Sequence, residues 1–379
     1  MTALMLAALA CAIWLYLLVG RGGFWLARER ERGELPPPAA WPKVAIVVPA
    51  RDEAEGIGAS MASLVRQDYP GDWSIVLIDD GSSDGTAAIA RQAAVDCGAA
   101  ARLEVIAGKP LPAGWTGKLW AVKQGIEGAQ ARMPAYLLLT DADIVYAPDV
   151  LTRLVARAER GGLVLTSLMV MLRCESLAER ALVPAFIFFF QMLYPFAWIN
   201  DRKRRTAGAA GGSMLVRAQA LRRAGGIEAI RNALIDDCAL AAVLKAQGPI
   251  WLGLTERVHS IRRYGGFADI RGMVARSAYA QLRCSPLLLL GTIAGMGVTY
   301  LAPPLLAVLG EGLAGALGLA AWLAMAIAFQ PTLRLYRASP LWGLALPAIA
   351  FCYTLFTLDS ALQFARGRGG LWKGRVQAG

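Results

Sequence analysis

Two aspartates separated by one residue end an apolar run in this chain. Asp141-Ala142-Asp143 follows residues 136–140, whose composition is typical of a buried parallel strand. Carboxylate oxygens are preferred ligands of Mg²⁺ and Mn²⁺, and an ion held by this pair could bind a diphosphate in the crevice beyond the sheet. An isolated Asp-x-Asp also occurs by chance in surface loops, so this interpretation needs support from the rest of the chain.

That support comes from the elements that must position the pair. Residues 44–48 and 74–78 are predicted to be buried strands, and residues 102–106 and 136–139 repeat the alternation with two more. Three stretches of helical pattern lie between them, at residues 58–66, 86–94 and 119–130. This alternation predicts an α/β fold with a mostly parallel sheet and helices on both faces.

Polar clusters follow three of these strands. They are Pro49-Ala50-Arg51-Asp52-Glu53 after the first, Asp79 to Thr86 after the second, and Asp141 to Asp143 after the fourth. Because ligands bind at the carboxyl ends of parallel strands, we expect all three clusters to face one crevice. Asp84, just before Gly85-Thr86, has the simpler expected role of a helix cap.

The chain is too apolar for an ordinary soluble enzyme. Of its 379 residues 56% are hydrophobic, and the mean hydropathy is +0.45. Residues 2–20 carry no charge and precede Arg21 and Arg28, so residues 1–21 predict a transmembrane helix with its basic end in the cytoplasm. A signal peptide fits less well, because no Lys or Arg precedes the apolar stretch.

Three further apolar stretches, residues 287–309, 313–330 and 341–358, predict C-terminal transmembrane helices within residues 286–363. A basic tail, residues 364–379, follows them. Four crossings that start from an outside N-terminus would place this tail outside, against the positive-inside rule. The conflict leaves open that one of the three C-terminal helices is re-entrant or interfacial.

Residues 42–281 lie between these anchors and are long enough for one water-soluble domain with a sizeable core. Residues 22–41 form a basic, proline-rich linker, in which Pro36-Pro37-Pro38 predicts an extended spacer that holds the domain a short distance from the membrane. The six cysteines show no short paired spacing, so the sequence predicts neither a zinc ribbon nor a disulfide framework.

A formal net charge of +11 predicts an anionic partner. Membrane anchoring favours an anionic phospholipid surface and a diphosphate substrate, and nothing in the chain resembles a nucleic-acid-binding module. Arg202-Lys203-Arg204-Arg205 follows an aromatic-rich stretch, and this order predicts an interfacial amphipathic segment over residues 182–205. A buried helix followed by a solvated basic loop is the alternative.

Four motifs, in order, resemble those of one family. They are Pro-Ala-Arg-Asp-Glu at residues 49–53, Ile-Asp-Asp-Gly-Ser-Ser-Asp-Gly-Thr at 78–86, Gly-Lys at 117–118 before a helix, and Asp-x-Asp at 141–143. The series is similar to the nucleotide-binding half of family 2 glycosyltransferases, and the resemblance covers most of residues 44–254. It implies the GT-A fold and a reaction with a nucleotide-activated sugar.

The resemblance also implies which residues hold the nucleotide. Asp80 would hydrogen-bond the base, uracil in a UDP-sugar. Glu53 and the backbone around Pro49, Ala50 and Arg51 would hold the base and the ribose.

For the diphosphate, the resemblance implies a divalent metal. Asp143 would bind Mg²⁺ or Mn²⁺, and Asp141 would contact the ribose, the donor sugar or the same ion, which compensates the charge on the leaving nucleoside diphosphate. Lys118 matches the family's Gly-Lys element at the start of a helix and could reach the diphosphate. A solvated lysine in the first helical turn is the alternative.

Inverting transfer needs a base that removes the proton of the acceptor hydroxyl. Asp236-Asp237 opens a helical pattern and resembles the acceptor-side acidic pair of the family, which implies that Asp237 is the base and Asp236 its supporting residue. Two acidic residues also favour a helix N-terminus on physical grounds alone. Gly211-Gly212-Ser213 would line the acceptor pocket.

Residues 273–277 lie where processive members of the family carry Gln-x-x-Arg-Trp, and only Arg276 matches. The missing Trp argues against a polymerising synthase and favours a single transfer to a lipid-like acceptor. Arg276 is a candidate to neutralise the diphosphate, with a structural salt bridge or a lipid contact as alternatives.

The arrangement of anchors, together with Gly-Trp-Thr-Gly-Lys-Leu-Trp-Ala at residues 114–121, resembles the glycosyltransferases associated with hopanoid biosynthesis in bacteria. This implies a multi-pass protein of the bacterial inner membrane, with a cytoplasmic catalytic domain and a hopanoid acceptor. The alternatives are transfer to ceramide, diacylglycerol or polyprenyl phosphate, a nucleotidyltransferase that releases pyrophosphate, and a non-catalytic membrane scaffold. The combined presence of Asp80, Asp143 and Asp237 argues against a scaffold.

Overall fold

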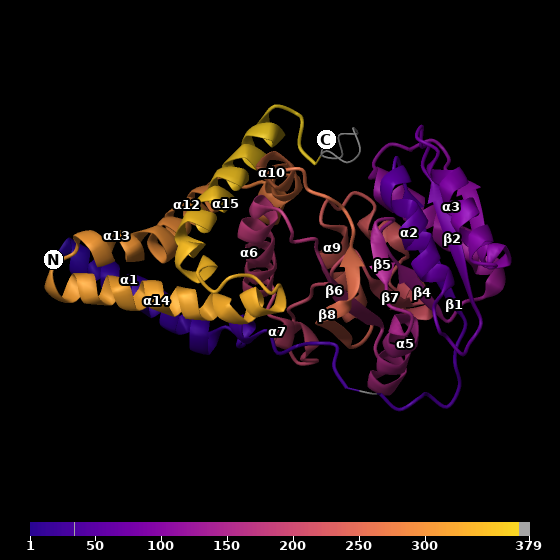
Figure 1. Cartoon of the computed structure of the whole chain (residues 1–379), viewed down its shortest axis with the longest axis horizontal. Helices are drawn as coiled ribbons and strands as arrows, with labels where there is room; N and C mark the ends of the chain where they lie inside the picture. Colours follow the sequence, from indigo (N-terminus) through magenta and orange to yellow (C-terminus); the bar gives the residue numbers. More distant parts are fainter. Residues whose placement is uncertain (34, 371–379) are drawn as a thin grey trace.

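The structure is a computed structural model that describes residues 1–33 and 35–370. Glu34 and residues 371–379, which include more than half of the expected basic tail, lie outside the described residues. Figure 1 shows an α/β domain at one end of the molecule and a group of long apolar helices at the other. This division follows the change from polar to apolar composition along the sequence.

One mixed sheet forms the α/β domain, with the strand order β3-β2-β1-β4-β7-β6-β8-β5. The strands are β1 (Val44–Ala50), β2 (Trp73–Asp79), β3 (Leu103–Ala107), β4 (Tyr136–Leu139), β5 (Ile144–Tyr146), β6 (Leu165–Met171), β7 (Met214–Arg217) and β8 (Ile250–Ser260). β3, β2, β1 and β4 run parallel, whereas β7 is antiparallel to both of its neighbours. β8 is parallel to β6, and the short edge strand β5 is antiparallel to β8.

Helices cover both faces of the parallel half of the sheet. Successive side chains of a strand point to opposite faces. Val47 therefore packs in one core with α4 (Gly117–Ala129), while Ile46 packs in the other with α2 (Ala54–Val65) and α3 (Thr86–Asp96). The predicted α/β fold with a mostly parallel sheet is confirmed. The remaining helices of the domain are α5 (Val150–Gly161), α8 (Ala218–Arg223), α9 (Asp236–Lys245), α10 (Phe267–Ala275) and α11 (Ala278–Gln281).

In the described part of the chain, four helices are long and apolar enough to span a membrane. They are Thr2–Gly20, Pro286–Leu309, Gly312–Leu335 and Trp342–Ala365. The first is α1 (Thr2–Leu15) with a π-helical extension, and the second joins α12 (Pro286–Met296) to α13 (Ala302–Leu309). The third and fourth are α14 and α15.

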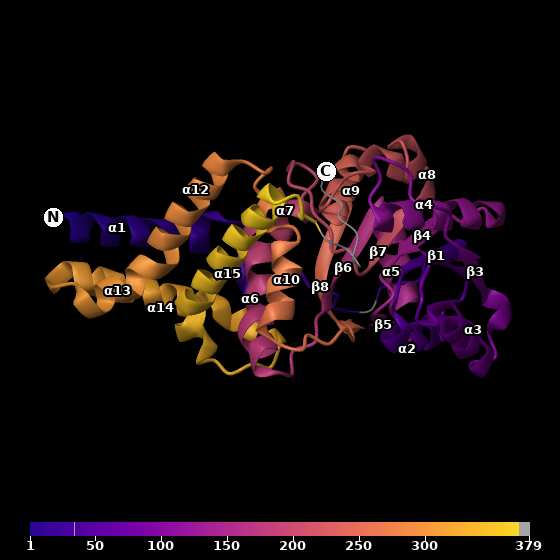
Figure 2. The same ribbon diagram turned by 90° about the horizontal axis from the view of Figure 1, so that it is seen from above.

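Helix α6 (Leu177–Leu193) lies between the sheet and the apolar helices (Figures 1 and 2). Ile187 and Phe188 on this helix are fully buried, and α10, α14 and α15 pack against it. The structure therefore does not place residues 182–193 on a surface as an amphipathic helix. Protein covers most of this apolar segment, as in the alternative of a buried helix. Leu193 at the end of α6 and the basic residues 202–205 beyond α7 (Phe196–Asn200) are exposed.

The first part of the linker is fastened to the domain. The Glu31 N–H donates to the Leu254 carbonyl at 2.8 Å, and the Leu254 N–H donates to the Glu29 carbonyl at 2.8 Å. The Glu31 carboxylate also accepts a hydrogen bond from Arg153 Nε at 2.5 Å. This part of the linker therefore lies along β8 and does not act as a free spacer.

Candidate active site

The ends of β1, β2 and β4 meet at one edge of the sheet, as their parallel order requires. The Asp80 N–H donates to the Ala50 carbonyl at 2.9 Å, which holds the first two loops side by side. Arg51 Nη1 donates to the Asp80 carbonyl at 2.5 Å and lies 3.7 Å from the Asp80 carboxylate. Because Asp80 is only 4% exposed, its carboxylate is held in a fixed position beside Arg51.

Asp84 organises the loop that carries Glu53. Its carboxylate accepts hydrogen bonds from the N–H groups of Thr86, at 3.1 Å, and Ala54, at 2.9 Å, the first residues of α3 and α2. The Glu53 N–H donates to Thr86 Oγ1 at 2.9 Å. Asp84 thus satisfies free N–H groups of both helices, which confirms its expected capping role.

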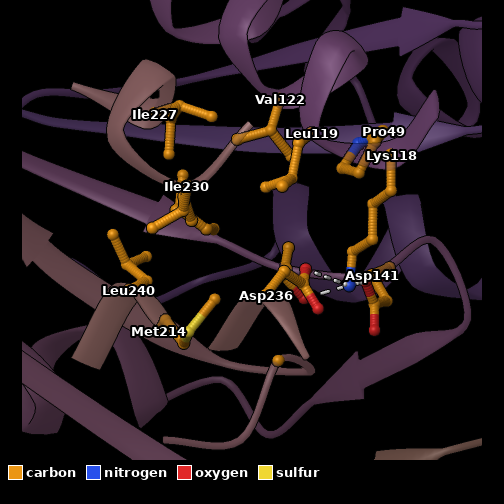
Figure 3. Close-up of a pocket in the computed structure, with 13 residues that line it drawn as sticks. Pro49, Lys118, Leu119, Val122, Asp141, Met214, Ile227, Ile230, Asp236 and Leu240 are labelled. Atoms are coloured by element: carbon orange, nitrogen blue, oxygen red, sulfur yellow. Dashed lines mark hydrogen bonds and ion pairs between the residues drawn. The ribbon is translucent and has the colours of Figure 1, made fainter. Parts of the chain in front are cut away.

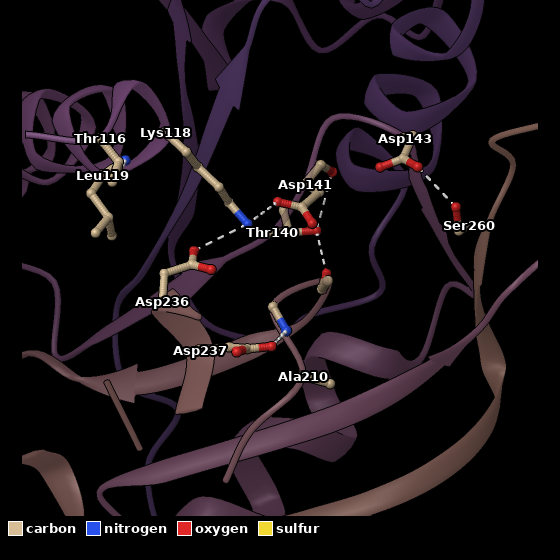
Figure 4. A network of polar contacts seen from close by, with 12 residues as sticks. Thr116, Lys118, Leu119, Thr140, Asp141, Asp143, Ala210, Asp236, Asp237 and Ser260 are labelled. Carbon is tan, nitrogen blue, oxygen red and sulfur yellow. Dashed lines mark hydrogen bonds and ion pairs between the residues drawn. The ribbon is translucent and has the colours of Figure 1, made fainter. Parts of the chain in front are cut away.

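Lys118 connects the end of β4 with the start of α9 (Figure 4). Its Nζ lies 2.8 Å from Asp141 Oδ1 and 3.2 Å from Asp236 Oδ2. The Lys118 side chain is 21% exposed, so it is not the solvated lysine of the alternative. Burial alone would lower the pKa of Lys118, but the attraction of Asp141 and Asp236 outweighs it and raises that pKa, so the ammonium form persists. Burial raises the pKa of Asp141, although Lys118 opposes this change.

Asp237 lies beside this network in the first turn of α9 (Figure 4). Its Oδ2 accepts a hydrogen bond from the Gly211 N–H at 3.0 Å, and its Oδ1 accepts one from the Cys238 N–H at 2.7 Å. Burial and the neighbouring charge of Asp236 raise the pKa of Asp237 to about 6. A Cβ at position 211 would stand 3.6 Å from Asp237 Oδ2 and 3.4 Å from Lys118 Nζ, so glycine keeps the space between these groups open.

Asp143 has a cationic partner for which sequence analysis assigned no role. Its Oδ2 accepts hydrogen bonds from Ser260 Oγ at 2.8 Å and from Arg262 Nε at 3.1 Å. Arg262 Nη2 lies 2.8 Å from Glu53 Oε1, so one guanidinium joins the residue expected at the ribose to the residue expected at the metal. Burial alone would lower the pKa of Arg262, but the charges of Asp143 and Glu53 outweigh this effect and raise that pKa.

The segment that carries Arg262 is held in turn by Glu179, in the first turn of α6. The Glu179 carboxylate is fully buried and accepts hydrogen bonds from the Tyr264 N–H at 3.2 Å and the Ser176 N–H at 2.8 Å. Arg173 Nη1 neutralises it at 3.1 Å. The only sequence signal for this arrangement was the capping-box pattern Ser-x-x-Glu, which does not reveal the contact with Tyr264.

The residues that the structure brings together fit a divalent ion only in combination with a substrate. Among the described residues, no group of three or more His, Cys, Asp or Glu side chains is placed to hold a metal ion. Asp141 is engaged by Lys118 and Asp143 by Arg262. Mg²⁺ is commonly held by one or two carboxylates together with substrate phosphates, and Asp143 with Asp141 can supply that number.

The predicted acceptor residues differ in their placement. Gly211 contacts Asp237, whereas the Gly212 carbonyl accepts a hydrogen bond from Thr140 Oγ1 at 2.8 Å and Ser213 is fully buried. Ser213 directly precedes β7, and its side chain is closed to solvent. Arg276 is exposed and near enough to oppose the rise in the pKa of Lys118.

Pro49 lines a small cavity with Lys118, Asp141 and Asp236 (Figure 3). The remaining wall is mostly apolar, with Leu119, Val122, Ile227, Ile230 and Leu240 among its residues. Its volume of about 20 Å³ suits one water molecule and not a nucleotide or a lipid. The charged network therefore borders a cavity that is too small, as it stands, to hold a substrate.

Comparison with known proteins identifies the domain. The model of the family described as Glycosyl transferase family 2 matches residues 45–225. A sequence search among curated proteins finds no match. Among solved structures, the mannosyltransferase PcManGT from Pyrobaculum calidifontis, in complex with GDP-Man and Mn²⁺, is similar with a TM-score of 0.58 and 19% identity, over 94% of this chain and 99% of that one.

Two further structures show weaker similarity. S. aureus TarS 1–349, in complex with UDP-GlcNAc, has a TM-score of 0.41 and 13% identity, over 89% of this chain and 97% of that one. Mannosyl-3-phosphoglycerate synthase from Rubrobacter xylanophilus has a TM-score of 0.39 and 17% identity, over 64% of this chain and 73% of that one. The match to the family model shows that residues 45–225 form a family 2 glycosyltransferase domain, with the GT-A fold, and that the protein is a glycosyltransferase.

Proposed function

We propose that this protein is a membrane-bound, inverting glycosyltransferase that moves a sugar from a UDP-sugar to a lipid acceptor, and that the acceptor is a hopanoid. The observation that carries the proposal is the position of Asp237. Its carboxylate lies beside the Lys118–Asp141 pair at the edge of the sheet, in a domain that packs on apolar helices long enough to span a membrane.

On the donor side, Asp80 and Glu53 with the backbone around Ala50 hold the nucleoside. Lys118 and Arg262 are the cations next to the carboxylates that would face the diphosphate. Asp143, with Asp141, would hold Mg²⁺ or Mn²⁺ there, and the ion would offset the charge that develops on the leaving nucleoside diphosphate. The Mn²⁺ and GDP-Man complex of the mannosyltransferase from Pyrobaculum calidifontis supports a metal-dependent donor site on this fold.

On the acceptor side, Asp237 takes the proton of a hydroxyl group while the oxygen attacks the anomeric carbon of the donor sugar. The bond from that carbon to the diphosphate breaks, and the configuration inverts. Asp236 assists by fixing Lys118 at 3.2 Å, which keeps a positive charge beside the base. A base that contributes through such proton transfer accelerates a reaction by roughly 10²–10⁴-fold.

A lipid acceptor is supported by the surroundings of the site and by its sequence. The missing Trp after Arg276 removes the element with which processive enzymes hold a growing glycan. Exposed Arg202, Lys203, Arg204 and Arg205 and the nearby Arg21 suit contact with anionic head groups at the cytoplasmic face of a bacterial inner membrane.

The proposal is tested by release of nucleoside diphosphate from the purified protein in native-like lipid. A panel of nucleotide sugars is offered with Mg²⁺ or Mn²⁺, with and without a hopanoid extract. We expect release that requires a UDP-sugar, the metal and the extract. Release with ceramide, diacylglycerol or polyprenyl phosphate in place of the extract would identify that lipid as the acceptor instead of a hopanoid. Release of pyrophosphate would contradict glycosyl transfer.

The raised pKa of Asp237 predicts a characteristic pH dependence. Asp237 acts as a base only when it is deprotonated, so the rate should rise with pH and reach half of its maximum near pH 6, because the pKa is about 6. An unperturbed aspartate would give this rise near pH 4. The measurement is kcat/KM between about pH 5 and pH 8. A rate that stays constant down to pH 5 would contradict the assignment.

Arg262→Gln is expected to weaken donor binding by about 10–100-fold, because hydrogen bonds to charged groups contribute about 1.5–3 kcal/mol. Arg262→Lys should recover only part of the loss, since lysine cannot engage Glu53 and Asp143 with a planar fork. The measurement is the dissociation constant of UDP by calorimetry. Arg263→Gln, at the exposed neighbouring position, is the matched control and should bind like the unmodified protein.

A further inference from the structure

Helix α15 ends against the catalytic domain. Ser360 Oγ, in its penultimate turn, accepts a hydrogen bond from the Tyr279 N–H at 3.0 Å and donates one to the Ala275 carbonyl at 2.5 Å. Arg271 Nε lies 3.6 Å from Asp359 Oδ2. These partners belong to α10 and α11 of the catalytic domain and directly precede α12. The C-terminal end of α15 therefore lies on the catalytic side of the apolar helices (Figures 1 and 2).

Helix α14 returns to the same side before α15 begins. Its last turn is followed by Tyr336, whose hydroxyl accepts a hydrogen bond from the Leu172 N–H, just after β6, at 3.4 Å. The opposite end of α14, at Gly312, lies next to the end of α13 at the tip far from the sheet (Figure 1). The chain has thus already crossed the apolar region when it reaches the start of α15.

The first turn of α15 lies against the middle of α14. Trp322 Nε1 donates to the Leu344 carbonyl at 3.1 Å, and Gln330 Nε2 donates to the Pro340 carbonyl at 3.1 Å. A helix of 24 residues, such as α14, is about 36 Å long, and Trp322 lies about 15 Å from its start. Residues 340–344 therefore reach only about half of the way back toward the far tip before α15 turns to the catalytic side.

We propose that α15 is a re-entrant helix, so that only three of the four apolar helices cross the bilayer. After α14 the chain enters the membrane again from the catalytic side and turns at residues 340–344, about halfway through the membrane. It then returns through α15 to the catalytic side. Non-helical backbone at this depth is tolerated because it packs against protein, here α14. The inference depends on the helices lying in a bilayer and not on the identity of the sugar or the acceptor.

The distribution of charge agrees with three crossings. With α15 re-entrant, Arg366 and Arg368 lie on the same side as Arg21, Arg28 and the basic loop beyond α7. Four crossings would place them on the opposite side, against the positive-inside rule. The re-entrant path removes the conflict that the sequence alone left open.

The exposed face of α15 fits lipid along its whole length. Leu344, Phe351, Leu355 and Leu362 are 46%, 48%, 45% and 54% exposed and recur at intervals of about seven and four residues, which places them on one side of the helix. This apolar stripe continues to the level of the contacts with α10. The part of the catalytic domain that contacts α15 therefore lies at the level of the acyl and head-group regions of the membrane. Through α10, α15 connects the bilayer to the preceding segment, which carries Arg262.

The test determines the sides of the two ends of the full-length chain. Short epitope tags are placed at the N-terminus, at the C-terminus, after Gly98 in the catalytic domain, and after Gly310 in the turn between α13 and α14. Protease access to each tag is measured in spheroplasts and in inverted vesicles. The tags after Gly98 and Gly310 calibrate the assay, because they lie on opposite sides whether the chain crosses three or four times.

We expect the C-terminal tag to be cleaved in the same preparation as the tag after Gly98, and the N-terminal tag in the other. Opposite sides for the two ends of the chain require an odd number of crossings. A C-terminal tag that is cleaved together with the N-terminal tag would mean four crossings and would overturn the proposal. Loss of glycosyl transfer with unchanged tag positions would concern the proposed function alone.

Discussion

Replacing Asp237 by asparagine is expected to lower kcat by about 10³-fold and to leave donor binding within about twofold of the unmodified protein. Asparagine has nearly the shape of aspartate and can still accept one hydrogen bond, from the Gly211 or the Cys238 N–H, but it cannot take a proton from the acceptor. Lys118 keeps both of its carboxylate partners, so the donor side of the site stays intact. The measurements are single-turnover transfer and UDP affinity on the same preparation.

The matched control is Asp236→Asn, at the adjacent position on α9. Its carboxylate lies 3.2 Å from Lys118, so its loss should weaken the positioning of Lys118 and reduce donor affinity more than Asp237→Asn does. Asp237→Asn and the metal-site variant Asp143→Asn should differ in donor affinity. An equal loss in both would contradict the separation between a base on α9 and a donor site at β4. Retention of transfer in Asp237→Asn would exclude Asp237 as the base.

Local pattern was sufficient for the first half of the domain. The strands β1, β2 and β4 are largely apolar, and the helices between the first four strands show regular helical patterns. β2 lies between β3 and β1, and β4 pairs in parallel with β1. The polar clusters at their ends came together as predicted, because parallel strands share one edge. Lys118, at the start of α4, and Asp236, at the start of α9, also lie 3.2 Å apart. Because α9 follows the antiparallel strand β7, the shared direction of parallel strands does not explain this contact.

The second half of the sheet depends on distant pairing that the sequence does not display. β5 and β7 span only Ile144–Tyr146 and Met214–Arg217, too short for a clear alternation. β7 pairs with β4 in antiparallel register, Leu139 opposite Met214. Arg262 was missed because its partner Glu53 is 209 residues earlier, and no spacing rule connects them.

The apolar segments show a different limit of the sequence. Hydropathy indicates that a face must be covered, but not whether lipid or protein covers it. Residues 182–193 and α15 have similar composition, yet Phe188 is fully buried while Phe351 is 48% exposed. By length and composition, the described residues contain four candidate spans, whereas the contacts of Leu344 and Ser360 show where α15 begins and ends.

Asp143→Asn is expected to abolish the metal-dependent part of donor binding. If Asp143 holds the ion that bridges the diphosphate, UDP affinity in Mn²⁺ should fall at least about 10–100-fold, to the value measured with a chelator, because even the outer partners of metal ligands contribute this much. Ser260 and Arg262 can still hydrogen-bond to the amide oxygen, so the fold should be retained.

The decisive quantity is the ratio of UDP dissociation constants with and without the metal, measured by calorimetry. Asp79→Asn is the matched control, because the Asp79 carboxylate lies at the same edge of the sheet but accepts a hydrogen bond from the Ser82 N–H within its own turn. The ratio should approach one in Asp143→Asn and stay unchanged in Asp79→Asn and Asp237→Asn. If the metal improves UDP binding in Asp143→Asn as much as in the unmodified protein, Asp143 does not hold the ion. Arg262 would then stay on the Asp143 carboxylate of the unmodified protein when the donor binds, and the ion would be held elsewhere.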